Sequence, residues 1–150
     1  MDFLSRLPDY EEQIQAIREI VLTNIMLLGQ TPCLPDKNDQ RFNSRRAQVF
    51  LNRMSDAGAG ECSTDSSGNP YAVIKGSAPK NTPIMLVAHM DTTFRNETES
   101  NYLIADEYMT GPGLLDNSLG VGVLMSMPYI LNALNLTFKE DIGVLPLEPL

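Results

Sequence analysis

One histidine and two aspartates are the residues of this chain whose types and spacing best suit metal chemistry. His89 and Asp91 stand two apart directly after the apolar run at residues 84–88, and Asp116 precedes a second apolar stretch. Alternate residues of an extended chain point to the same side, so His89 and Asp91 can face one pocket. A neutral imidazole is a common metal ligand, and a nearby carboxylate can fix its ring and tautomer. Because His89 is the single histidine, a site that needs two histidines cannot be completed within these 150 residues.

Both segments also have a purely structural interpretation. A His-x-Asp pair after a strand can simply end the strand and begin a turn. Asp116 precedes a predicted helix, where the helix dipole favours an anion, so it can be a capping residue. The nearby Gly111 and Gly113 do not form a phosphate-binding loop, because neither a third glycine nor a phosphate-binding lysine follows them.

Hydrophobic periodicity predicts the elements that must position these residues. An amphipathic helix is expected to begin after Asp9, which forms a capping box with Glu12, and to end at Gly29. A second helix is expected over residues 39–57, with glycines ending it. Four apolar runs of strand length cover residues 71–75, 84–88, 102–105 and 141–147.

Two of these segments determine the predicted fold class. The run at 84–88 is continuously apolar, which predicts a strand covered on both faces. Residues 117–134 predict a helix that is apolar nearly all round and packed inside the domain, with a kink or a break at Pro128. The order of helices and strands predicts an α/β layered domain, whose ligand site lies at the carboxyl ends of strands.

Composition limits the classes of function. A length of 150 residues suits one domain, and the net charge of −8 argues against nucleic acid or an anionic membrane as a partner. Cys33 and Cys62 do not make a disulfide framework, so a reducing, cytoplasmic compartment is expected. No signal peptide is expected, and the longest mostly apolar stretch, residues 121–131, is too short to span a bilayer.

The segments around the three candidate residues together resemble the co-catalytic zinc exopeptidases and aminoacylases, the group that contains peptidase T and bacterial glutamate carboxypeptidase. The sequence AHMDT at residues 88–92 is followed by GPGLLDN at residues 111–117. The lead-in SGNPYA at residues 67–72 and the helix around RRA at residues 45–47 also fit this group. The resemblance implies a three-layer α/β/α catalytic domain, of which residues 1–150 are the N-terminal part.

This resemblance implies a role for each candidate residue. His89 would be a ligand to one Zn²⁺ ion, and Asp116 would bridge two Zn²⁺ ions. Asp91 would be the catalytic carboxylate that orients the site. The peptide bond between Asp116 and Asn117 is expected to be cis. The implied chemistry is hydrolysis of an amide bond by a metal-bound water.

The sequence departs from the family pattern after its last strand. Glu148 lies close to where an acidic pair is expected, but a single glutamate does not form that motif and receives no role. The general-base glutamate, the later metal ligands and the lid or dimerisation domain have no counterparts within the 150 residues. The resemblance therefore implies a catalytic domain truncated after about half of its elements, with weak zinc binding and no activity by itself.

Three hypotheses of function stay open on the sequence alone. The first is a zinc-dependent exopeptidase or amidohydrolase that acts on a small peptide or an N-acyl amino acid. The second is a non-catalytic binding or assembly module of the same fold, which forms a homo-oligomer through an exposed sheet edge or is completed by another chain. The third, a flavodoxin-like or nucleotide-binding domain, is least favoured because no phosphate-cradling loop is present.

Overall fold

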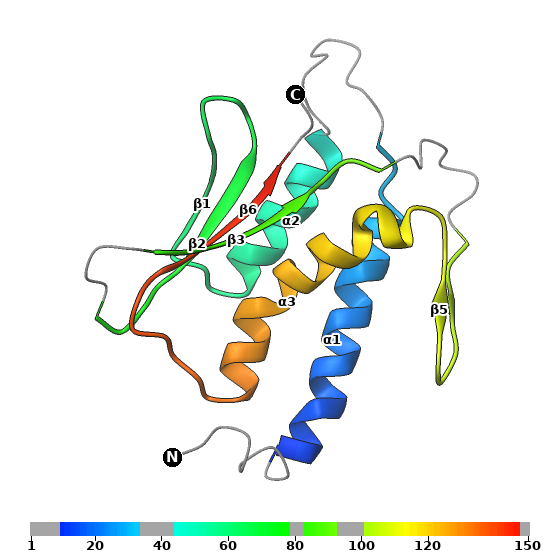
Figure 1. The fold of residues 1–150 in the computed structure, drawn as a ribbon, viewed down its shortest axis with the longest axis horizontal. Helices are drawn as coiled ribbons and strands as arrows, with labels where there is room; N and C mark the ends of the chain where they lie inside the picture. The colour runs from blue at the N-terminus through cyan, green and yellow to red at the C-terminus, as the bar shows by residue number, and fades with distance from the viewer. Residues whose placement is uncertain (1–9, 34–43, 79–82, 93–100, 148–150) are drawn as a thin grey trace.

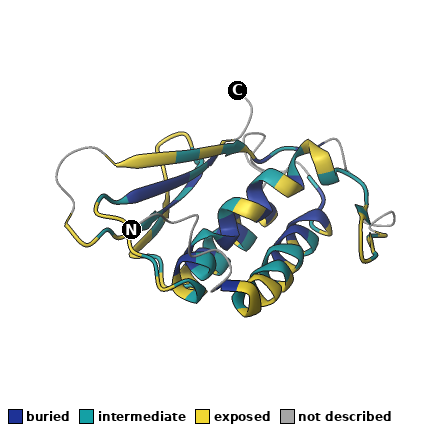
Figure 2. Ribbon diagram, turned by 60° about the horizontal axis from the view of Figure 1, so that its bottom comes forward, coloured by how far each residue is buried: buried dark blue, intermediate teal, exposed yellow. Residues whose placement is uncertain are grey.

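A mixed sheet with helices packed on one side forms the described part of the molecule (Figures 1 and 2). The computed structural model describes residues 10–33, 44–78, 83–92 and 101–147. From one edge to the other, the sheet contains β1 (Glu61–Thr64), β2 (Pro70–Ile74), β6 (Ile142–Leu147) and β3 (Ile84–His89). β3 runs parallel to β6, with Leu86 opposite Val144 and His89 opposite Leu147, whereas the other neighbouring strands are antiparallel.

Three helices form the second layer. They are α1 (Glu11–Gly29), α2 (Ser44–Asp56) and α3 (Leu119–Ala133). The predicted end of the first helix at Gly29 is confirmed, and its N-cap position is taken by Tyr10; the predicted cap Asp9 lies outside the described residues. In the second helix, Phe50 and Met54 are fully buried. The described part of this helix begins at Ser44, so its predicted start lies outside the described residues.

The hydrophobic core lies between the sheet and the helices. It contains Leu28, Phe50, Met54, Ala72, Met90, Val121, Met125, Leu131, Ile142 and Val144. These residues come from all three helices, from the two inner strands β2 and β6, and from the residue that follows β3. The core therefore holds the end of β3 against the helical layer, and this end is where the candidate residues lie.

Three strand predictions need correction. β3 was expected to be covered on both faces, but within the described residues it lies at the edge of the sheet, and its Met85 and Val87 side chains are about half exposed; the buried inner strand is β6. A strand at β1 was not predicted, because its mostly exposed and polar residues carry no hydrophobic pattern. The strand predicted at 102–105 shortens to β4 (Leu103–Ile104) and pairs with β5 (Met109–Thr110) in a separate hairpin.

α3 is the apolar helix that the sequence predicted. By length and composition alone, Leu114–Ala133 is apolar enough to cross a bilayer. The regular helix has only 15 residues, or about 22 Å, which is shorter than the roughly 30 Å hydrocarbon core of a membrane. Pro128 lies inside α3 without ending it, and Val121 and Met125 are buried in the core. The helix is therefore a core helix of the folded domain, packed against α1 and β3.

Asp141 joins β6 to the end of β2 and makes stability depend on pH. Its carboxylate accepts hydrogen bonds from the Gly76 N–H at 2.8 Å and from Lys75 Nζ at 3.0 Å. The Gly76 N–H and then Lys75 hold the pKa of Asp141 below its ordinary value of 3.8. This stabilisation is present above the unfolded-state pKa and is lost as the pH falls through the lower folded-state pKa.

We therefore expect Asp141→Asn to lower the free energy of unfolding near neutral pH and to have a smaller effect in strong acid, where the wild-type carboxylate is protonated as well. Urea denaturation of both proteins across the acid range measures this difference. Asp106→Asn, in the exposed turn between β4 and β5, is the control. An effect of Asp141→Asn that is the same at neutral pH and in strong acid would contradict the assignment.

Candidate metal centre

The end of β3 presents two candidate side chains on the same side of the chain. Met90, between them, turns the opposite way into the core, and its N–H donates to the Leu147 carbonyl at 2.7 Å. His89 and Asp91 stay partly exposed, with side chains 48% and 39% accessible. His89 Nδ1 lies 3.0 Å from Asp91 Oδ1. The prediction that this His-x-Asp pair faces one side is therefore confirmed.

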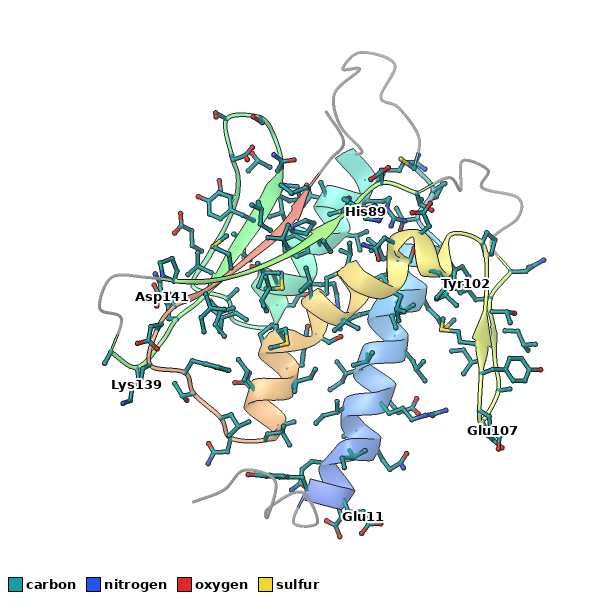
Figure 3. All side chains as sticks on the ribbon, in the orientation of Figure 1. Glu11, His89, Tyr102, Glu107, Lys139 and Asp141 are labelled. Carbon is teal, nitrogen blue, oxygen red and sulfur yellow. The ribbon has the colours of Figure 1, made fainter. Side chains whose placement is uncertain are left out.

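Asp116 reaches the same imidazole from a second element. It lies in η3 (Leu114–Ser118), an irregular turn before α3 in which Asp116 and Asn117 have non-helical backbone angles. The peptide bond between these two residues is cis, as the resemblance implied. Asp116 Oδ1 lies 3.6 Å from His89 Nε2, so the two ring nitrogens face different carboxylates. Figure 3 shows His89 at the end of β3, close to the start of α3.

Asn117 connects the two elements that carry these side chains. Its Nδ2 donates to the His89 carbonyl at 3.2 Å, and its Oδ1 accepts the Gly120 N–H at 3.2 Å. The second bond satisfies one of the free N–H groups at the start of α3. A side chain at Gly120 would collide with the Asn117 amide, so glycine is needed for this contact. The link to His89 was not predicted, because side-chain amide contacts between distant segments leave no sequence pattern.

The donor atoms fit one metal ion between His89 and Asp116. With its proton on Nδ1, directed at Asp91, His89 leaves the Nε2 lone pair free for a metal. Two ligands with bonds of about 2.1 Å at a tetrahedral angle are about 3.4 Å apart. The observed separation of 3.6 Å is close to that value. Among the described residues, no group of three or more His, Cys, Asp or Glu side chains gathers around a metal position.

Arg46 is a further residue beneath this centre, and sequence reasoning placed it only in a helix. Its guanidinium is fully buried and donates to the carbonyl of Met90 and to the hydroxyl of Ser118. Backbone carbonyls are its main acceptors, and these carry no residue-type signal. The family resemblance included the RRA segment at residues 45–47 but gave Arg46 no role.

The mixed sheet and the helical layer thus bring one imidazole and two carboxylates together at the end of β3. The sequence model of Peptidase family M28 matches residues 69–147, which include both β3 and Asp116. This chain belongs to Peptidase family M28. It is thus a hydrolase-family chain, in agreement with the resemblance of its motifs to zinc exopeptidases. No curated protein matches the chain.

Solved structures of peptidases share the fold at low sequence identity. Aminopeptidase PepT from Bacillus cereus superposes with a TM-score of 0.68 at 18% identity, over 86% of this chain and 36% of that chain. Dipeptidase Dug1p from Saccharomyces cerevisiae gives 0.69 at 13% identity, over 89% and 33%. Human carnosine dipeptidase 1 gives 0.69 at 15% identity, over 94% and 34%. The chain therefore spans about one third of the length of these proteins.

Proposed function

We propose that this chain is part of the catalytic domain of a metal-dependent exopeptidase or N-acyl amino acid amidohydrolase. The observation that carries the proposal is the position of the His89 ring between two carboxylates. Its Nδ1 faces Asp91 at 3.0 Å, while its Nε2 faces Asp116 at 3.6 Å. An orienting carboxylate on one ring nitrogen and a ligand carboxylate near the other is an arrangement that suits a bound Zn²⁺ ion.

Each of the three side chains has a separate role in this proposal. His89 and Asp116 would hold a Zn²⁺ ion between them. Asp91 fixes the tautomer and orientation of the imidazole through Nδ1. Zinc, when bound, lowers the pKa of its water and polarises the substrate carbonyl. The partial exposure of these side chains leaves room for a substrate to approach them.

We propose a small peptide or an N-acyl amino acid as the substrate, in a cytoplasmic setting. The names of the structural neighbours support the peptide class, since they describe an aminopeptidase and two dipeptidases. The net charge of −8 gives no support to a nucleic-acid partner.

The two assigned ligands are fewer than the four or so that a closed zinc site uses. We therefore expect the 150 residues to bind Zn²⁺ weakly and to show no detectable hydrolysis by themselves. Further ligands and a general-base glutamate would come from other parts of a complete enzyme or from a complementing chain.

The single histidine provides a direct test of the proposed site. NMR of the imidazole gives one set of ring signals, and the proposal predicts that Nε2 shifts on Zn²⁺ addition while the proton stays on Nδ1. A hydrolysis assay with dipeptides and N-acyl amino acids runs in parallel. Unchanged ring signals at millimolar Zn²⁺ would contradict the metal site, and turnover without metal would contradict the mechanism.

Asp91→Asn tests the orienting role separately from the ligand role. The amide keeps the shape of the side chain but removes its charge, so we expect Zn²⁺ affinity to fall about 10–100-fold, the usual effect of losing a partner of a ligating histidine. Competition with a metal indicator measures the affinity, and Asp106→Asn is the control at an exposed turn. Equal affinities of Asp91→Asn and wild type would remove Asp91 from the site.

The alternative function, an assembly module, is favoured by one observation. In the part of the chain that the structure describes, β3 is at the edge of the sheet, and its Met85 and Val87 side chains are about half exposed. An apolar strand with unpaired backbone groups can add to the same strand of a second copy. Light scattering after size-exclusion chromatography tests this function. A wild-type dimer that becomes a monomer in Val87→Lys would support it. A wild-type monomer at all concentrations would argue against it.

A further inference from the structure

Arg46 is a fully buried charged side chain in the first turn of α2. Arginine is rarely buried to this extent unless its donors are satisfied, because removing a charge from water is unfavourable. The partners that compensate this burial therefore show what the side chain holds in place. They lie on three different elements, two of which carry the candidate metal centre.

The first group of partners is at the end of α1. Arg46 Nη1 donates to the Leu28 carbonyl at 2.8 Å and to the Thr31 carbonyl at 2.9 Å. The last carbonyls of a helix lack helical partners and carry the negative end of the helix dipole, so a cation is favourable there. The end of α1 therefore gives the guanidinium a fixed position beneath the sheet edge.

The second group of partners lies on the two segments that carry the site, and consists of a backbone carbonyl and a side-chain hydroxyl. Arg46 Nε donates to the Met90 carbonyl at 3.0 Å, and Met90 lies between the two candidate residues of β3. Arg46 Nη2 lies 3.4 Å from Ser118 Oγ, two residues after Asp116. The planar guanidinium of Arg46 thus contacts both the end of β3, which carries His89, and η3, which carries Asp116. Because a guanidinium has rigid geometry, it fixes the separation of these segments.

Tyr102 is a partly buried side chain that contacts the segment leading into η3. Its hydroxyl donates to the Pro112 carbonyl, on the segment that leads into η3. Burial raises the pKa of Tyr102, whereas its hydrogen bond with Ser118 and the charge of Arg46 oppose this rise. A side chain at Gly111 would collide with the Tyr102 ring, which shows how closely the ring packs there. Figure 3 shows Tyr102 at the start of the β4–β5 hairpin.

We propose that Arg46 is a positioning residue for the metal centre, because it joins the Met90 carbonyl to the Ser118 hydroxyl beneath it and so holds the two segments at a fixed separation. Direct packing does little to hold the site itself, since the His89 and Asp116 side chains are 48% and 57% exposed. Their separation of 3.6 Å therefore depends on the backbone segments that Arg46 joins. The inference rests on the proposed function, in which these two side chains bind zinc.

The experiment compares Arg46→Lys, Arg46→Met and Ser118→Ala with a matched control. Asn24→Ala is that control, because Asn24 is also fully buried and bonds Ser126 and Arg53, all outside the centre. Urea denaturation first establishes which variants fold. Ser118→Ala removes a single hydroxyl from the Asp116 side and keeps the proposal testable if the Arg46 variants do not fold.

Two readouts are measured on the folded variants at one fixed pH. The first is Zn²⁺ affinity from an indicator competition, which we expect to fall about 10–100-fold in Arg46→Met and less in Ser118→Ala. The second needs no metal: the ring nitrogen signals of His89 report how firmly the proton stays on Nδ1. We expect a mixture of tautomers in Arg46→Met and the wild-type state in Asn24→Ala.

These readouts separate the two proposals. If the wild-type protein does not bind Zn²⁺ but the ring signals change in the Arg46 variants, the proposed function fails and the positioning role stands. If every folded variant keeps the wild-type affinity and ring signals, the positioning role is overturned. It is also overturned if Asn24→Ala changes both readouts as much as Arg46→Met. A general loss of stability would then be enough to change the Zn²⁺ affinity and the ring signals.

Discussion

Asp116→Asn is expected to reduce Zn²⁺ affinity by on the order of 100-fold or more, a larger effect than the loss of an orienting partner. The substitution keeps the size and shape of the side chain but removes the negative charge that faces His89 Nε2 at 3.6 Å. Of the two assigned ligands, only the imidazole of His89 would then remain. Indicator competition measures the affinity, and the NMR signals of the imidazole show whether zinc still contacts the ring.

Asp106→Asn is the matched control for this change, since it removes the same charge from the exposed β4–β5 turn. The control should keep the wild-type affinity, because it leaves the facing imidazole and carboxylate in place. Equal affinities of Asp116→Asn and wild type would show that the metal, if bound at all, uses other residues. Equal losses in both variants would show that net charge, and not a ligand, controls binding.

Phe50→Ala is expected to lower the free energy of unfolding by about 3–5 kcal/mol, as large-to-small changes of buried aromatic residues do. Phe50 is fully buried on the inner side of α2, within the core between the helices and the sheet. A typical domain is stable by only about 5–15 kcal/mol, so this variant would lose a large share of its stability. Urea denaturation measures the change.

Phe138→Ala is the matched control for the core, since this phenylalanine is 42% exposed in the turn before β6. We expect it to change the free energy of unfolding by less than about 1 kcal/mol. Similar losses in the two variants would contradict the position of the core. A small loss in Phe50→Ala alone would mean that α2 does not pack as described.

The pairing of His89 with Asp91 could be predicted from sequence, because it depends only on local alternation along a strand. Their approach to Asp116 could not be derived from alternation or periodicity, because β3 and η3 are far apart in the chain and meet only when both pack against the helices. The family resemblance supplied that expectation, and the separation of 3.6 Å agrees with it. The cis peptide after Asp116 was likewise expected from the resemblance alone.

Other parts of the fold were missed for physical reasons. The apolar run of β3 has the composition of an inner strand, but among the described residues it is paired on one side only, with β6. β1 was missed because its four residues are polar or small and are placed in the sheet by pairing with β2. Arg46 was missed because its partners are mainly carbonyl groups, which every residue possesses.

Crystals soaked with Zn²⁺ and measured at the zinc absorption edge would test the central claim most directly. The proposed centre predicts an anomalous peak within bonding distance of both His89 Nε2 and Asp116 Oδ1, with Asp91 still on Nδ1. A peak bound to other residues, or side chains of His89 and Asp116 that point away from each other with no peak between them, would contradict it.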